Sequence, residues 1–246
     1  MRRFLFNPNE REESIVRLCS EESHHITNVL RLAAGAEVEL FDGKGKLFLG
    51  EIEEIGKKVR VRLVSQKEVL SHEGAALWLF QADLKGKKMD LVIQKATELG
   101  VERIVPFTCS RSQGRVGKDR RKRKSERWQK LIEGACKQSM RLTLMRCEEE
   151  VSMSAALDSA VLSRSSGPKL LFWEEERDYH LSDIDWQKPF DRACIMLGPE
   201  GGFSDQEIVK ARELGWQTVS LGRQVLRAET ATIAAISIVQ HHLGKI

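Results

Sequence analysis

The pattern of apolar residues in the second part of the chain predicts strands that alternate with helices. Short apolar runs, typical of buried strands, lie at 76–82, 103–107, 169–173 and 193–197. Apolar residues at helical spacing predict helices over 87–99, 124–140, 152–162 and 230–243. Strand, helix, strand order indicates a parallel sheet. We therefore expect one α/β domain over residues 75–246.

The first 70 residues have a different pattern. Short runs rich in apolar residues at 38–41, 47–52 and 59–64, with an Asp42-Gly43 turn, predict antiparallel strands. A helix is expected from Glu21 to Ala34, closed by Gly35. We expect a small β-barrel domain over 1–70, with the domain boundary within the polar stretch 66–74.

Two glycine turns follow strands of the α/β domain. The first turn, 198–202, reads Gly-Pro-Glu-Gly-Gly and leads into a helix that Ser204 caps and Gly215 ends. The second turn is Gly222, after a strand at 218–221. We expect the two strands to be neighbours, which would place both turns at the carboxyl edge where open α/β sheets bind ligands.

The first turn lacks the phosphate-binding patterns G-x-G-x-x-G and G-K-[ST]. It also carries Glu200 where an anion would have to sit. A neutral or cationic ligand is therefore favoured over a phosphate.

These turns resemble the motifs of a known family. Gly-Pro-Glu-Gly-Gly-Phe-Ser at 198–204, Leu-Gly at 221–222 and Leu-Arg-Ala-Glu-Thr-Ala at 226–231 are similar to those of the ribosomal small-subunit methyltransferase E family. The helical segment 94–101 also matches. These proteins are 16S rRNA (uracil-N3) methyltransferases of the SPOUT superfamily. The resemblance implies S-adenosyl-L-methionine as the cofactor, an α/β knot in the C-terminal domain and a PUA-like N-terminal domain that docks RNA.

The resemblance also implies a substrate and an assembly. The substrate would be uridine 1498 of 16S rRNA in the small ribosomal subunit, and the protein would be a homodimer. Two alternatives stay open. One is a SPOUT ribose 2′-O-methyltransferase, whose Asn-x-Gly-x-x-x-Arg motif is missing from 96–103. The other is a noncatalytic RNA-binding factor of ribosome assembly.

Candidate catalytic residues follow from the chemistry of methylating a uracil nitrogen. Arg227 is expected to stabilise negative charge on the base oxygens. Glu229 or Glu200 is expected to accept the proton or to hold polar groups of the cofactor. The residues expected to bind the cofactor surround the two turns and the end of the strand at 169–173. They are Phe172, Trp173, Leu197, Gly198, Pro199, Glu200, Gly201, Gly202, Leu221, Gly222, Leu226, Thr230 and Ala231, with Glu174 as a further candidate.

Basic charge is concentrated in one segment. The chain has a net charge of +4, yet residues 111–130 hold ten Lys or Arg against two acidic residues. We expect an exposed loop here that runs into the helix at 124–140. A solvated surface is one explanation, and contact with RNA phosphates is the other. The residues expected to contact RNA are Arg2, Arg3, Arg31, Lys95, Arg115, Arg120, Arg121, Lys122, Arg123, Gln138 and Arg141.

Two of these expectations have a plain alternative or a gap. Lys95 and Glu98 stand three apart on one helical face, which is also the spacing of a surface ion pair. In the segment that resembles the family's Glu-Gln-x-x-Arg pattern, Lys137 replaces the acid and has no assigned role.

The remaining composition indicates a cytoplasmic protein. Five scattered cysteines without C-x-x-C spacing favour reduced thiols over disulfides or a zinc site, so no metal is expected. The N-terminus lacks the apolar core of a signal peptide, and the apolar run at 233–239 is too short to span a bilayer. We expect no membrane partner.

Overall fold

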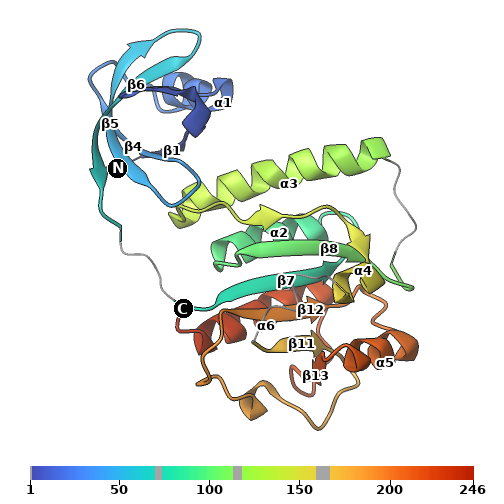
Figure 1. Cartoon of the computed structure of the whole chain (residues 1–246). Coiled ribbons are helices and arrows are strands. Elements are labelled where there is room, and N and C mark those ends of the chain that lie inside the picture. Colours follow the sequence, from blue (N-terminus) through green and yellow to red (C-terminus); the bar gives the residue numbers. More distant parts are fainter. Residues whose placement is uncertain (1, 70–73, 113–117, 159–166) are drawn as a thin grey trace. The chain divides into compact units, whose positions relative to one another are not determined.

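The computed structural model describes residues 2–69, 74–112, 118–158 and 167–246. The chain forms two compact units (Figure 1). The first comprises Met1–Ser71 with Glu133–Leu144, and the second comprises His72–Ile132 with Met145–Ile246. The sequence boundary at 66–74 stays a prediction, and the segment 133–144 gave no sequence signal of its place in the first unit.

The first unit contains a six-stranded sheet in the order β1-β4-β5-β6-β3-β2. Its strands are β1 (Arg3–Leu5), β2 (Arg11–Glu12), β3 (Ile15–Arg17), β4 (Glu37–Phe41), β5 (Leu47–Ile55) and β6 (Val59–Lys67). The three predicted strands correspond to β4, β5 and β6. These three strands pair antiparallel, as expected, whereas β1, which was not predicted, pairs with β4 in parallel. Strands of two or three residues such as β1, β2 and β3 are too short to show alternation in a sequence.

The helix expected from Glu21 to Ala34 is shorter than predicted. Helix α1 (Ser20–His24) passes into the π-helical turn η2 (His25–Val29). The Leu30 N–H donates to the His25 carbonyl, five residues back, and Arg31 has the left-handed φ of 50°. The left-handed residue reverses the chain and ends the helix, the position that glycine usually takes. A short 3₁₀ turn, η1 (Pro8–Glu10), precedes this region.

The long helix α3 (Lys118–Ser139) begins six residues before the predicted start at Lys124. Lys and Arg are good helix formers, and Asp119 lies in the first turn, where a negative charge is favourable. The expectation of a loop up to residue 123 was therefore wrong for 118–123. Residues 113–117 lie outside the described residues.

In the second unit the strands form a parallel sheet in the order β10-β8-β7-β12-β11-β13, and β9 also pairs with β8. The strands are β7 (Ala76–Ala82), β8 (Arg103–Thr108), β9 (Arg146–Cys147), β10 (Val151–Ser152), β11 (Lys169–Phe172), β12 (Arg192–Leu197) and β13 (Gln217–Val219). The prediction that the strands before the two glycine turns are neighbours was wrong. Strand β11 lies between β12 and β13 and pairs with both. The carboxyl ends of all three strands still meet at one edge of the sheet.

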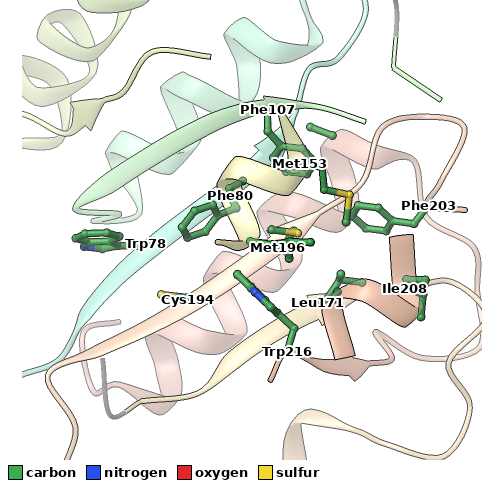
Figure 2. Close-up of a cluster of buried hydrophobic side chains, with 14 residues drawn as sticks. Trp78, Phe80, Phe107, Met153, Leu171, Cys194, Met196, Phe203, Ile208 and Trp216 are labelled. Atoms are coloured by element: carbon green, nitrogen blue, oxygen red, sulfur yellow. The ribbon is translucent and has the colours of Figure 1, made fainter. Parts of the chain in front are cut away.

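Helices cover the sheet of the second unit. Helices α2 (Lys88–Glu98) and α6 (Ala228–His242) contact each other, and α6 packs on β12. Helices α4 (Met153–Leu157) and α5 (Asp205–Glu213) contribute to a core that contains Phe80, Met196 and Trp216 (Figure 2). The predicted end of α4 at 162 lies outside the described residues. A 3₁₀ turn, η3 (Leu181–Asp183), lies between β11 and β12. Among the described helices, none combines the length and the apolar character that crossing a membrane requires.

Candidate functional site

A cavity of about 290 Å³ lies at the carboxyl ends of β11, β12 and β13. Its wall comes from the loops after these strands and from the first turns of α2 and α6. It brings the catalytic candidate Arg227 together with most of the residues expected at the cofactor site, namely Phe172, Trp173, Glu174, Leu197, Gly198, Pro199, Glu200, Gly202, Leu221, Gly222, Leu226 and Ala231. Three expected residues, Gly201, Glu229 and Thr230, are not among the described residues that line the cavity.

Several lining residues were missed by the sequence reasoning. They are Lys88, Ser220, Arg223, Gln224, Val225 and Ala228. Five of the six belong to the segment 220–228, within or next to the motif that carried the resemblance. Lys88 is different, because it begins α2 after the loop that follows β7. The sheet topology explains its position: β7 pairs in parallel with β12, so the carboxyl end of β7 lies at the same edge as the cavity.

The glycine turn after β12 packs tightly against the end of β11. Gly202 has a left-handed φ of 68°, and its N–H donates to the Pro199 carbonyl at 3.0 Å. A Cβ atom at this position would lie 2.0 Å from Glu174 Oε1. The left-handed backbone conformation therefore favours glycine here, and any other residue would also require the Glu174 side chain to move.

The start of α5 fixes the far end of this turn. The Glu207 carboxylate accepts hydrogen bonds from the Ser204 N–H (2.9 Å) and hydroxyl (3.0 Å), and from the Ser110 N–H (2.7 Å) and hydroxyl (3.1 Å). Burial alone would raise the pKa of Glu207, but these bonds outweigh burial and lower it. The buried Phe203 and Ile208 lie before and after Ser204 at the positions of a hydrophobic staple (Figure 2).

A second carboxylate holds the loop after β11. Glu176 accepts from the Thr218 hydroxyl at 2.5 Å, from Arg212 at 3.1 Å and from the Arg177 and Asp178 N–H groups at 3.1 Å. Burial would raise the pKa of Glu176, yet the hydrogen bonds from the Thr218 hydroxyl and from the backbone N–H groups lower it. The loop that carries Trp173 and Glu174 is thereby tied to β13.

Lys88 joins three of the loops that form the cavity. Its Nζ lies 3.2 Å from Glu200 Oε1, after β12, and 3.5 Å from Glu229 Oε2, in the first turn of α6. The Lys85 N–H also donates to Glu200 at 3.1 Å. Burial would raise the pKa of Glu200, but the backbone N–H groups and Lys88 lower it. The hydrogen bond to Glu200, supported by Glu229, raises the pKa of Lys88. Glu200 is thus ionised and already has a cationic partner.

Arg227 stands at the mouth of the cavity. It precedes α6 in an extended conformation, with φ −63° and ψ 148°, and its side chain is exposed. Leu226 and Val225 beside it are exposed to 37% and 78%. An exposed guanidinium next to an apolar surface can contact a planar substrate that enters from solvent.

The arginines of the first unit have different environments. Arg3 is largely buried and binds Glu39 through Nη2 at 2.9 Å, so its charge is compensated. Arg2 is exposed and donates to the Leu30 carbonyl at 3.3 Å. Arg31 is exposed. Arg2 and Arg31 are therefore more accessible to RNA than Arg3.

Two further candidates and Lys137 lie in the segment 133–144. Gln138 is exposed and Arg141 is half-buried. Lys137, which had no role in the sequence, forms a 2.7 Å ion pair with the buried Glu22. The residue that departs from the family pattern therefore forms an ion pair within the first unit.

Many cations of α3 form ion pairs within the second unit. Lys124 Nζ lies 2.5 Å from Asp83, Arg121 lies 3.8 Å from Glu150, and Arg127 pairs with Asp90. Lys122 and Arg123 are exposed. Arg115 lies outside the described residues, as does the side chain of Arg120. Lys95 forms the 2.7 Å ion pair with Glu98 that its spacing allowed.

The cavity suits a small organic ligand with a cationic part. Its volume is close to the lower end for small-molecule sites. Apolar side chains, including Phe172, Leu197 and Leu226, offer surface to a flat ring, and glycines of both turns also line the cavity. S-adenosylmethionine fits this donor set. Over the described residues, no group of three or more His, Cys, Asp or Glu side chains is arranged to hold a metal ion.

Comparisons with known proteins agree with this geometry. An RNA methyltransferase domain model matches residues 72–240, and an RNA methyltransferase PUA domain model matches residues 18–63. The ribosomal RNA small subunit methyltransferase E of Rickettsia conorii is 31% identical over 97% of this chain and 94% of its own length.

Solved structures are also similar. The ribosomal RNA small subunit methyltransferase E of Neisseria gonorrhoeae, bound to S-adenosyl methionine, is 32% identical, with a TM-score of 0.87 over 98% of this chain and 97% of that one. A methyltransferase of Legionella pneumophila with bound SAM is 32% identical, with a TM-score of 0.86 over 97% and 96% of the two chains. These matches confirm the predicted fold class, a SPOUT α/β knot domain with a PUA-like domain. The chain belongs to the ribosomal RNA small subunit methyltransferase E family of RNA methyltransferases.

Proposed function

We propose that this protein uses S-adenosyl-L-methionine to methylate N3 of a uridine in 16S rRNA of the small ribosomal subunit. The family resemblance points to uridine 1498. The observation that carries the proposal is the cavity, whose wall unites the glycine turn 198–202 with the motif 221–231. Relatives of similar sequence and fold that hold the same cofactor support it.

In the proposed reaction, the cofactor supplies a methyl group carried on a positively charged sulfur. The protein has to bring the uracil nitrogen in line with that methyl group, and positioning of this kind lowers barriers by about 7 kcal/mol or more in favourable cases. Arg227, exposed at the mouth of the cavity, would donate hydrogen bonds to a uracil carbonyl oxygen as negative charge develops on it.

The acceptor of the N3 proton would be a carboxylate or water. Three donors stabilise the ionised form of Glu200 and so lower its pKa, which makes Glu200 a weak base here. Glu229 Oε2 is buried beside Lys88, and Glu229 is not one of the described residues that line the cavity. We therefore assign Glu200 to the cavity wall and expect proton transfer to water, or to Glu229 after a change of its rotamer.

The proposed partners follow from the same reasoning. The exposed Arg2, Arg31, Lys122 and Arg123 would contact RNA phosphates, with Gln138 as a further contact. A homodimer and a cytoplasmic location remain predictions from the resemblance and the cysteine content. Sedimentation of the purified protein would measure the assembly directly.

The test of the function is a methyl-transfer assay on undermodified small subunits with labelled cofactor, followed by mass spectrometry of the nucleosides. We expect 3-methyluridine. Label on a ribose hydroxyl would instead identify a 2′-O-methyltransferase, and no transfer to any rRNA would identify a noncatalytic RNA-binding factor.

Arg227→Ala tests the proposed role of the guanidinium. We expect the rate of methyl transfer to fall at least 100-fold, since single donors to a developing oxyanion contribute about that much. RNA affinity and cofactor affinity should change less than threefold, as measured by filter binding and calorimetry. Equal loss of rate and of RNA affinity would show that Arg227 only binds RNA.

A further inference from the structure

Lys88, the first residue of α2, is the only described lining residue that this helix contributes. It reaches the two loops on which the family motifs lie. Its ammonium group lies 3.2 Å from Glu200, in the loop after β12, and 3.5 Å from Glu229, in the first turn of α6. The two carboxylate oxygens are therefore at most 6.7 Å apart across the same nitrogen.

The charges around this ammonium do not balance. Lys88 contributes one positive charge against the two carboxylates, so the group carries a net charge of −1. Glu229 Oε2 is buried, and no hydrogen bond to it was found among the described residues. Glu174, Arg223 and Arg227 also line the cavity. The six charged side chains together therefore carry no net charge, and the excess of −1 is local to the group around Lys88.

This local negative charge acts on a ligand whose own charge changes during the reaction. The sulfur of S-adenosylmethionine is positive, whereas in the product, S-adenosylhomocysteine, the same sulfur has regained its electron pair and is neutral. A cavity with too much negative charge would stabilise the donor in its ground state. Stabilisation that is lost in the transition state slows the transfer.

We propose that Lys88 sets the local charge around Glu200 in the cofactor cavity: it offsets Glu200 and so limits how strongly the cavity prefers the sulfonium donor over its neutral thioether product. Lys88 is in this sense a positioning and specificity residue. The inference rests on the proposed function, because it needs S-adenosylmethionine as the ligand.

The experiment measures the dissociation constants of S-adenosylmethionine and S-adenosylhomocysteine by calorimetry on the full chain. In Lys88→Met the net charge of the group formed by residue 88, Glu200 and Glu229 changes from −1 to −2. One unit of charge within about 10 Å, at the effective dielectric constant near a protein surface, alters the ratio of the two constants roughly tenfold. We expect the affinity for S-adenosylmethionine to rise relative to the affinity for S-adenosylhomocysteine.

Three further variants separate charge from structure. Glu200→Gln removes one negative charge, so the ratio should move in the opposite direction, toward the thioether. Lys88→Met with Glu200→Gln restores the net charge and should restore the wild-type ratio. Lys87→Met removes the same side chain from the exposed neighbouring position and should leave the ratio unchanged.

The outcomes are distinct. If Lys88→Met weakens both ligands equally, Lys88 only supports the loops and the inference is wrong. Should Lys88→Met fail to fold, a ratio in Glu200→Gln that does not move toward the thioether would overturn it equally. If the wild-type protein binds neither ligand, the proposed function itself fails.

Discussion

At the scale of single residues, Lys137 provides the positive charge that the buried Glu22 carboxylate requires. Glu22 has a side chain exposed to only 6%, and Lys137 Nζ is 2.7 Å away. They lie 115 residues apart in the sequence. No spacing rule could connect them, because the contact exists only after α1 and the segment 133–144 have come together in the first unit.

Replacing Lys137 by Met should leave the Glu22 carboxylate buried without its cation. We expect the free energy of unfolding to fall by about 2–3 kcal/mol, because removal of one partner from a buried pair leaves an uncompensated charge. Urea unfolding followed by circular dichroism would measure the loss. Glu22→Gln in the same chain should recover part of it. A stability loss below about 0.5 kcal/mol would show that the pair behaves as an exposed surface ion pair.

At the scale of elements, the connection between β8 and α5 depends on one carboxylate. Glu207 accepts four hydrogen bonds from Ser204 and Ser110. The Ser204 and Glu207 pattern was readable in the sequence as a capping box. The bonds to Ser110 were not, because Ser110 lies 97 residues earlier.

Glu207→Ala should destabilise the second unit by roughly 2 kcal/mol, since hydrogen bonds to charged groups contribute more than neutral ones. It should also weaken S-adenosylmethionine binding, because the glycine turn 198–202 ends at this helix start. Thermal unfolding and calorimetry would measure both effects. Glu213→Ala, at an exposed position of the same helix, is the matched control. Unchanged cofactor affinity in Glu207→Ala would separate the cap from the cavity.

The elements that the sequence could predict are those with strong local patterns. Strand β7 matches its predicted range, and α2, α5 and α6 lie within two residues of theirs. The errors arose where a non-local or unusual conformation decides the structure. Arg31 ends a helix in a conformation that usually requires glycine, and β11 enters between β12 and β13 through pairings no local pattern encodes.

The candidate site follows the same division. The loops of the cavity could be predicted because their glycines and charged residues form contiguous motifs. The environment of Glu200 could not be predicted, because Lys88 lies 112 residues before it in the sequence. The sequence therefore suggested an open carboxylate facing a cation, whereas the protein itself supplies that cation.

At the scale of the whole molecule, acid should destabilise both units. Glu39 in the first unit and Glu176 and Glu207 in the second have pKa values below the ordinary 4.5, because hydrogen bonds and cations outweigh the effect of burial. A lowered folded-state pKa gives stability that is full above the unfolded value and is lost as the pH falls through the folded value.

We therefore expect the free energy of unfolding to be nearly constant from pH 7 to about 5 and to fall steadily below pH 4.5. Urea titrations at half-unit pH steps would measure this. Glu176→Gln should be less stable at pH 7 and show a shallower decline in acid. A flat profile between pH 5 and 3 would contradict the assignment of these carboxylates as stabilising anions.

The ammonium of Lys88 joins a residue from the middle of the chain to one near its end, since Glu229 follows it by 141 positions. During synthesis on the ribosome, the cavity cannot be complete until α6 has emerged. We expect nascent and prematurely terminated chains to bind no methyl donor, so that RNA modification begins only with finished protein.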